Sequence, residues 1–387
     1  MDKITKILMS LIKNVVQEEN IDISQYSVLS QQEEEELFQL ASQHSIGGMV
    51  GHILGESNEI KKTPTVKKLM NEAFTAVYRY EQLQMDIDEI TNVLIDLQIP
   101  YIILKGPKVR KYYPKPWFRT SCDIDVLIHE DDIEGVVNTL VEKYFYEKQE
   151  RNYHDVSLIS NNNILLELHF NIKENMDNLD QVLERVWEYS SCSHKENDME
   201  YELSNEFFLF HLLAHMAYHF QEGGCGIRSV LDIYLIHHKM EYDEVQFRSL
   251  CKEAGIETFY DYIIQLSEVW FGGKEHTEIT SAMEEYIIHG GTFGTKDNSA
   301  AVGQLKKGGH LQYMYSRIFA SYDHLKGRYP SLSQHKFLMP LYQIRRWIDM
   351  IRKGRLKRYM KECSLSRNIS KKQLDSTEKL LKKLKLN

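Results

Sequence analysis

Proline and cysteine are both scarce in this chain, and their distribution excludes several classes of protein. Only seven of the 387 residues are proline, and long stretches also lack glycine, so the sequence favours helix. The five cysteines show neither the pairing of a disulfide framework nor a Cys-x-x-Cys metal knuckle. We therefore expect reduced thiols and a cytoplasmic protein.

Long apolar runs and an overall excess of basic charge are missing as well. No apolar run reaches the roughly 18 residues of a membrane-spanning helix, and the N-terminus lacks a signal-peptide pattern. The formal net charge of −9 argues against a dedicated nucleic-acid-binding protein. Basic residues dominate from Arg352 onward, and we expect the last helix, near residues 377–386, to be a solvated or self-associating tail, with a membrane- or nucleic-acid-binding role as the alternative.

The remaining composition is that of a globular protein with more than one core. Hydrophobic residues make up 42% and charged residues 27% of the chain, and this length predicts two or three subdomains. Apolar residues recur at helical spacing through the N-terminal part, most clearly over residues 66–97. We predict a helical N-terminal segment over 1–85, a core over 86–190 and a helical domain with a basic tail over 191–387, with no strand after about Asp177.

Three carboxylates stand inside apolar strand patterns in the predicted core. Asp123 and Asp125 are one residue apart, so they share one face of a strand. Glu167 occupies a second apolar run of the same kind. Like charges on a buried strand face are costly without a cation. Three carboxylates on two strands suit two-metal phosphoryl transfer, so we predict two Mg²⁺ ions, with Mn²⁺ as the alternative, on Asp123, Asp125 and Glu167.

A hairpin pattern surrounds Glu167. Strand patterns at residues 154–159 and 164–170 flank the turn-forming Asn161, Asn162 and Asn163. His169 shares the strand face of Glu167 and could contact a metal or a substrate, although a lone strand histidine is more often structural.

Basic side chains and a Lys-Gly turn precede the aspartates. Residues 101–104 predict a short buried strand that ends at Gly106, and Pro107 suits the first turn of a helix. Backbone amides at such a helix start, with Lys105 beside them, can meet a phosphate. Arg119 offers a guanidinium for bidentate phosphate binding. The simpler alternatives are a plain strand-to-helix turn and a surface arginine.

These residues, in this order, resemble the uncharacterised nucleotidyltransferase family of the polymerase-β-like nucleotidyltransferase superfamily. The resemblance covers about residues 94–170, with looser matches at 211–219 and 328–330. It implies an α+β fold in which a small mixed β-sheet core carries a helical N-terminal segment and a larger all-helical C-terminal domain. The superfamily has Gly-Ser where this chain has Lys105-Gly106-Pro107. The resemblance rests on Leu104-Lys105-Gly106, Arg119, Asp123-Ile124-Asp125 and Glu167-Leu168-His169.

The resemblance implies transfer of a nucleoside monophosphate from an NTP, with ATP expected, to an acceptor, and release of pyrophosphate. The acceptor is expected to be a small molecule, peptide or protein rather than nucleic acid, and neither the base preference nor the oligomeric state follows. Glu167 would complete the second metal site or take the acceptor's proton. The residues that it places at the nucleotide are Lys105, Gly106, Arg119 and His169.

Two other functions stay open at this stage. The missing Gly-Ser pair leaves room for a catalytically inactive nucleotide-binding or regulatory module with the same fold. His211, His215 and His219 share one helix face, and a metal hydrolase could be centred on His211, His215 and Asp232, although no Glu follows the first His as in a zincin. We expect this histidine face to line the cleft opposite the carboxylates. Arg228 is expected to pair with Asp232, four residues on, as an exposed or interhelical ion pair.

Overall fold

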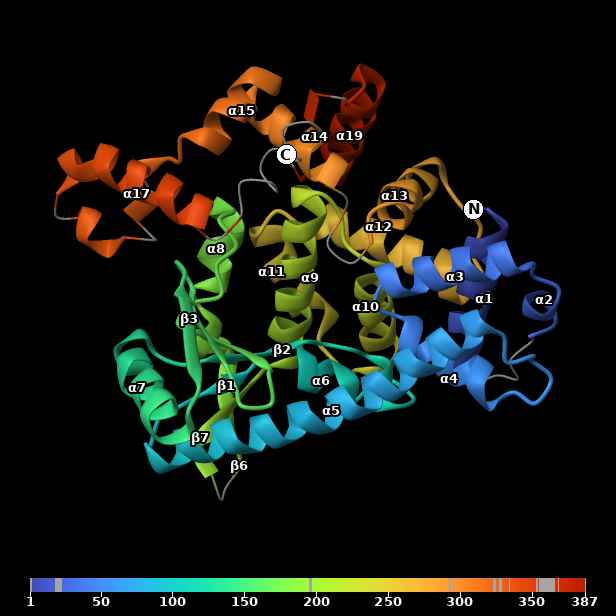
Figure 1. Ribbon diagram of the computed structural model, residues 1–387, viewed down its shortest axis with the longest axis horizontal. Helices are drawn as coiled ribbons and strands as arrows, with labels where there is room; N and C mark the ends of the chain where they lie inside the picture. The colour runs from blue at the N-terminus through green and yellow to red at the C-terminus, as the bar shows by residue number, and fades with distance from the viewer. Residues whose placement is uncertain are drawn as a thin grey trace.

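The fold combines one mixed sheet with many helices, as the sequence predicts. The computed structural model describes residues 2–17, 23–194, 197–291, 294, 296–322, 325–326, 329–333, 335–352, 354, 366–367 and 369–386. These contain a helical N-terminal region, a five-stranded mixed sheet and a large helical C-terminal region (Figure 1). The predicted α+β class is therefore confirmed, whereas the predicted boundaries near residues 85 and 190 stay predictions. Most of the basic stretch from 353 to 365 lies outside the described residues.

The N-terminal helices lead into the sheet through one long helix. Ser30 and Glu33 form a capping box at the start of α3, with the Ser30 side chain accepting from the Glu33 amide. The second half of α5 buries Leu83, Ile87 and Ile90 against the sheet (Figure 1). This confirms the helix predicted over 66–97. The N-terminal helices are α1 (Lys3–Val16), α2 (Ser24–Ser27), α3 (Gln31–Gln43), α4 (Gly47–Glu56) and α5 (Pro64–Asp96).

The sheet has the order β1-β2-β5-β4-β3. Its central pair, β2 and β5, is parallel, and Asp125 stands directly opposite Glu167 in their register. The other neighbours are antiparallel, so β4 and β5 form the predicted hairpin. The elements of this region are β1 (Ile102–Ile103), α6 (Gly106–Arg110), η1 (Pro116–Phe118), β2 (Asp123–Leu127), η2 (Glu130–Asp132), α7 (Ile133–Tyr144), β3 (Glu147–Arg151), β4 (Asp155–Ile159) and β5 (Leu165–His169).

Three strands, β3, β6 and β7, were not predicted. The edge strand β3 is almost entirely charged and polar, which suits an unpaired edge but gives no apolar alternation to recognise. A second hairpin, β6 (Ser190–His194) with β7 (Asn197–Leu203), corrects the prediction that no strand follows Asp177. Acidic residues alternate with Met199 and Tyr201 in β7, and the carbonyl of Met199 accepts from the Tyr101 amide beside β1.

The C-terminal region is built around α9. This helix is buried on most sides, and it ends at Gly223, where φ is 144° and an added Cβ would lie 2.3 Å from the Ser299 hydroxyl. Only glycine fits there. The remaining elements are α8 (Asp177–Leu183), η3 (Val186–Tyr189), α9 (Asn205–Glu222), α10 (Ile227–Lys239), α11 (Glu244–Glu253), α12 (Glu257–Ser267), η4 (Glu268–Gly272), α13 (Glu278–Ile288), α14 (Lys296–Lys307), α15 (His310–Ile318), η5 (Pro330–Ser333), η6 (Lys336–Leu338), α17 (Met339–Arg352) and α19 (Lys371–Leu384).

The last helix is not the solvated tail that its basic composition predicts. In α19 the side chains of Leu380, Leu381 and Leu384 are buried, and the helix packs beside α14 (Figure 1). Gln221 of α9 also donates a hydrogen bond to the carbonyl of Leu386. Its leucine stripe therefore belongs to the core of the C-terminal region. No helix among the described residues is long and apolar enough to cross a membrane.

Candidate active site

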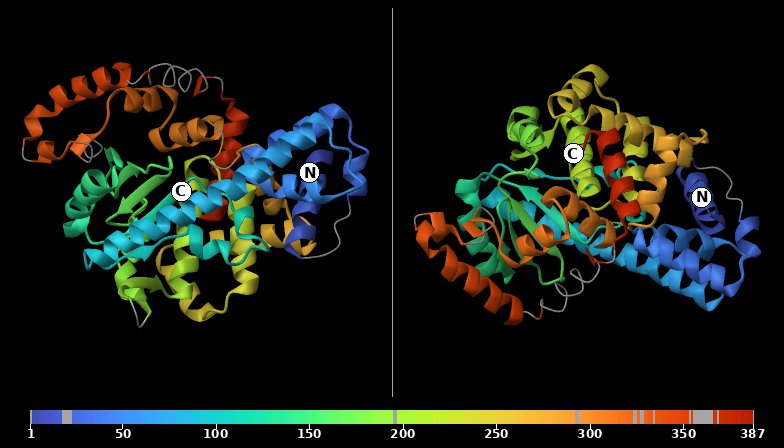
Figure 2. Two further views of the ribbon diagram at one scale, coloured as in Figure 1. Left: turned by 60° about the horizontal axis from the view of Figure 1, so that its bottom comes forward. Right: turned by 90° about the horizontal axis from the view of Figure 1, so that it is seen from above.

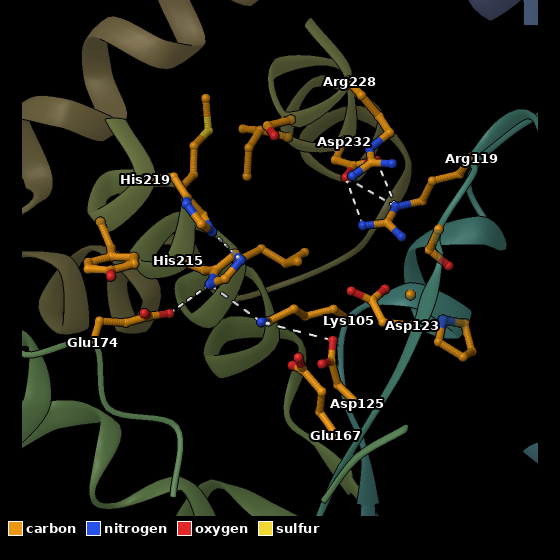
Figure 3. A pocket seen from close by; sticks show the side chains of 18 of the residues that line it. Lys105, Arg119, Asp123, Asp125, Glu167, Glu174, His215, His219, Arg228 and Asp232 are labelled. Carbon is orange, nitrogen blue, oxygen red and sulfur yellow. Dashed lines mark hydrogen bonds and ion pairs between the residues drawn. The ribbon is translucent and has the colours of Figure 1, made fainter. Parts of the chain in front are cut away.

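A cavity of about 430 Å³ lies between the end of the β2–β5 pair and the helices α9 and α10. Figure 3 shows carboxylates from the strands on one side and histidine, arginine and acidic side chains from the helical side facing them. Six of the seven predicted site residues line it, and His169 lies buried beneath. The six are Lys105, Gly106, Arg119, Asp123, Asp125 and Glu167.

The two aspartates of β2 occupy different electrostatic environments. Asp123 opens onto the cavity, but the cavity walls remove hydration from its carboxylate and, with the charges of Asp125 and Glu167, raise its pKa. Asp125 is buried, which alone would raise its pKa, but the charges of Lys105 and His169 hold the pKa well below its usual range. The site thus keeps Asp125 ionised next to a crowded Asp123.

His169 supports the carboxylates from beneath. Its Nε2 lies 3.2 Å from Asp125 Oδ1 and 3.6 Å from Glu167 Oε2. Burial alone would lower the pKa of His169, but the hydrogen bonds to Asp125 and Glu167 outweigh it and raise the pKa to about 9. A protonated His169 therefore balances part of the negative charge of the site.

We expect this histidine to make the metal-free protein less stable at high pH. Because the pKa of His169 is raised from 6.5 to about 9 on folding, its contribution is fully present below about pH 6.5 and is lost as the pH rises through about 9. The contribution should be on the order of 3 kcal/mol. Urea unfolding in a chelator at about pH 6 and about pH 10 measures it. His169→Gln should lose this slope; an unchanged slope would assign it to other groups.

Lys105 joins the two walls of the cavity. Its ammonium lies 4.0 Å from Asp125 Oδ2 and 3.4 Å from His215 Nδ1 (Figure 3). The backbone of Lys105 has φ 41° and ψ −89°, a conformation that non-glycine residues rarely adopt. Such strain persists where the surroundings enforce it and often marks functional sites. This backbone conformation places the Lys105 side chain beside the carboxylates of the site.

The wall opposite the strands carries two neutral histidines of α9 and a glutamate from the connection after β5. Oε1 of Glu174 lies 2.7 Å from His215 Nδ1, and Nε2 of His219 lies 3.0 Å from His215 Nε2. Burial and the nearby Lys105 lower the pKa of His215, and burial and His215 lower that of His219 to about 3. The predicted cleft-lining role is confirmed for these two histidines. It is wrong for His211, which is 1% exposed and does not line the cavity.

Asp232 pairs with Arg119, which corrects the predicted Arg228–Asp232 ion pair. Nε of Arg119 donates to both carboxylate oxygens of Asp232 at 3.0 and 3.1 Å, and the Tyr113 hydroxyl donates to the same carboxylate at 2.7 Å. Arg228 instead donates to the carbonyl of Thr120. Arg228 and Asp232 are four residues apart on α10, which predicted that they pair. The partner of Asp232 is instead Arg119, from the loop before β2. This ion pair fixes the loop that leads to Asp123.

The donor set on β2 and β5 fits divalent metal ions. Ligand atoms of Asp125, Glu167 and His169 lie within 4.8 Å of one another, and carboxylate oxygens are the donors that Mg²⁺ prefers. The charges of Asp125 and Glu167 help to raise the pKa of Asp123, so a bound cation would relieve the repulsion among the three carboxylates. Among the described residues, no potential metal-binding group includes the α9 histidines or Asp232. The hydrolase alternative therefore has no ligand cluster in this part of the chain.

Comparisons with known proteins point to one family. A family model described as "Uncharacterised nucleotidyltransferase" matches residues 30–272. A search of curated proteins finds no significant match. A solved structure titled "Solution Structure of Antibiotic-Resistance Factor ANT(2'')-Ia Reveals Substrate-Regulated Conformation Dynamics" is similar with a TM-score of 0.34 and 14% identity, over 48% of this chain and 97% of that one.

Proposed function

Because the chain belongs to the uncharacterised nucleotidyltransferase family, we propose that it transfers a nucleoside monophosphate from an NTP to an acceptor and releases pyrophosphate. ATP is the proposed donor. The observation that carries this proposal is the parallel pairing of β2 with β5, in which Asp125 lies directly opposite Glu167. Both carboxylates line the same cavity as Asp123. Three carboxylates from two strands, with basic groups beside them, match what phosphoryl transfer requires.

Divalent ions, Mg²⁺ or Mn²⁺, would be held by Asp123, Asp125 and Glu167. When bound, two such ions neutralise the triphosphate and stabilise both the attacking and the leaving oxygen. Asp125 is prepared for this because its neighbours keep it ionised. His169 would keep the Asp125 and Glu167 side chains in place through its contacts from beneath.

The chain's own groups would position the phosphates. Lys105 would turn its ammonium from Asp125 and His215 toward phosphate oxygens as their negative charge arrives. Gly106 also lines the cavity beside Lys105, at a position where an added Cβ would make ordinary contacts of 3.7 Å with both Arg119 Nη1 and Ser121 Oγ. Arg119 already has the Asp232 carboxylate as partner, so its proposed contact to the nucleotide would use its remaining donor atoms.

The transfer step needs no covalent intermediate with the protein. The acceptor oxygen would bond to the α-phosphorus while the bond to the β-phosphate oxygen breaks, and its electrons leave with pyrophosphate. Glu167 lines the cavity and would either complete the second metal site or take the acceptor's proton. A cavity of about 430 Å³ is within the size range of small-molecule sites. We therefore propose a small molecule, or the side chain of a peptide or protein, as acceptor.

A labelling experiment tests the proposal. Each NTP, labelled at the α-phosphate, is incubated with the protein, Mg²⁺ and a cell extract, and the labelled product is isolated. Wild type should transfer label to an acceptor, and Asp123→Asn should not. A protein that binds NTP and transfers no label in any extract would instead be the inactive nucleotide-binding module.

Lys105→Ala should weaken NTP binding because one charged phosphate contact is lost. The expected loss is about 1.5–3 kcal/mol, roughly 10- to 150-fold in Kd. Lys111→Ala is the control, because Lys111 is exposed at the end of α6 and does not line the cavity. Calorimetric titration with a non-hydrolysable NTP measures both. Equal affinity in the two variants would move the phosphate site away from Lys105.

A further inference from the structure

Helix α17 presents its apolar side chains to solvent and its polar ones to the protein. Gln343 and Arg346 are each 6% exposed. The opposite face carries a stripe with exposed fractions of 48–62%, which consists of Leu341, Ile344, Ile348 and Ile351. These four recur at the spacing of one helix face. An ordinary surface helix has the reverse arrangement.

Hydrogen bonds fix this orientation. Gln343 Nε2 and Arg346 Nη1 donate to the carbonyl of Ile318 at 2.9 and 3.0 Å, and Arg346 Nη2 donates to that of Arg317 at 2.8 Å. These carbonyls belong to the end of α15, where the helix leaves them without intrahelical partners. Turning the apolar stripe inward would move Gln343 and Arg346 away from the carbonyls of Arg317 and Ile318, which would lose these donors. The stripe therefore faces outward as a consequence of how α15 and α17 are joined.

The end of α15 extends the exposed apolar surface. Leu311, Tyr315 and Ile318 are 78%, 65% and 47% exposed and recur on one face of α15. The ring of Phe319 contacts both Tyr315 and Trp347, at centroid distances of 4.8 and 5.5 Å, and so links the two helices. Figures 1 and 2 show α15 and α17 at the rim of the molecule, outside the helices around α9. We refer to residues 310–319 and 335–352 as the arm.

The charge of the arm indicates what covers it. The chain carries a net charge of −9, yet within residues 335–352 Asp349 is the single acid, against Lys336, Arg345, Arg346 and Arg352. The sequence that follows, residues 353–361, adds five Lys or Arg residues and no acid. Two copies of the arm placed together would bring these like charges close to one another. An anionic lipid surface matches both the apolar stripe and the charge.

We propose that the arm binds the surface of membranes that contain anionic lipids. The stripe of α17 lies at the boundary between headgroups and acyl chains, while Arg345 and Arg352 contact the headgroups. Tyr315, which is 65% exposed, suits this depth because it has an apolar ring and a polar hydroxyl. The proposal goes beyond nucleotidyl transfer and does not depend on it. It concerns attachment to a surface and no membrane-spanning segment.

Vesicle co-sedimentation of the full chain tests the proposal. Wild type should sediment with phosphatidylcholine vesicles that contain phosphatidylglycerol, bind phosphatidylcholine alone more weakly, and release on addition of salt. The double variant Ile344→Glu/Ile348→Glu should partition at least roughly tenfold less. Arg345→Ala/Arg352→Ala should lose the preference for phosphatidylglycerol. Val245→Glu is the matched control, because Val245 is 81% exposed on α11, and it should bind as wild type does.

Three results would overturn the proposal. In the first, wild type remains in the supernatant with both kinds of vesicle. In the second, the Val245→Glu control loses binding as fully as the stripe variant. In the third, wild type binds no vesicle and is a dimer in sedimentation velocity, whereas the Ile344→Glu/Ile348→Glu variant is a monomer. A second copy would then cover the stripe. Because the substituted side chains are exposed, circular dichroism should show all variants folded, so a loss of binding reports the surface itself.

Discussion

Asp125→Asn is expected to abolish nucleotidyl transfer and to destabilise the metal-free protein, whereas Asp123→Asn should abolish transfer alone. Both substitutions remove a proposed metal-binding charge, so each should lower kcat by roughly 10²–10³-fold or more. The stabilities should diverge because the two carboxylates have different neighbours. Lys105 and His169 lower the pKa of Asp125, whereas burial and like charges raise that of Asp123.

Urea unfolding in a chelator near neutral pH measures the difference. Loss of the Asp125 charge leaves Lys105 and His169 without their shared partner, and should cost about 1–3 kcal/mol. Loss of the Asp123 charge relieves repulsion from Asp125 and Glu167, so the free energy of unfolding should stay equal or rise. Equal destabilisation in both variants would contradict these electrostatics. Normal transfer by either one would contradict the metal site.

Asp232→Asn is expected to be the most destabilising single change around the cavity, at about 3–5 kcal/mol. The reason is that Arg119 and Asp232 are both buried, and the isosteric amide leaves the guanidinium uncompensated. Glu244→Gln is the matched control. It breaks the ion pair with Arg248, whose atoms are 2.9 Å apart but solvent-exposed, and it should cost at most about 1 kcal/mol.

The comparison of the two variants is made by chemical denaturation at neutral pH. A loss in Asp232→Asn no larger than in Glu244→Gln would mean that the Arg119 ion pair does not hold the loop before β2. The structure instead predicts that this loop, and with it Asp123, depends on the pair.

The carboxylate group could be predicted from sequence because local rules determine it. Period-two alternation places Asp123 and Asp125 on one strand face, and the three asparagines mark the hairpin that carries Glu167. The structure adds the parallel register, which local alternation does not determine. The sequence also predicts that the His169 side chain lies on the same strand face as Glu167. The raised pKa of His169 could not be predicted in this way, because it depends on Asp125 of the neighbouring strand as well as on Glu167.

The opposite wall could be predicted only in part. The spacing of His215 and His219 indicates a shared helix face, but nothing in the sequence shows that Glu174, from the connection after β5, meets His215. The ion pair of Asp232 with Arg119 joins residues far apart in the sequence. The spacing of four residues between Arg228 and Asp232 predicted a different pair. Amphipathicity likewise does not reveal which side a helix buries. The leucines of α19 are covered by the chain itself, whereas the Leu and Ile stripe of α17 is exposed.

Pyrophosphate formation tests the proposed activity most directly. The protein is incubated with Mg²⁺, NTP labelled at the γ-phosphate and a cell extract whose enzymes have been inactivated by heat but whose small molecules, peptides and proteins are retained, and the labelled products are separated. The proposal predicts labelled pyrophosphate that depends on the extract and is absent with Asp125→Asn. Labelled orthophosphate in its place, or no pyrophosphate from any NTP although the nucleotide binds, would contradict nucleotidyl transfer at Asp123, Asp125 and Glu167.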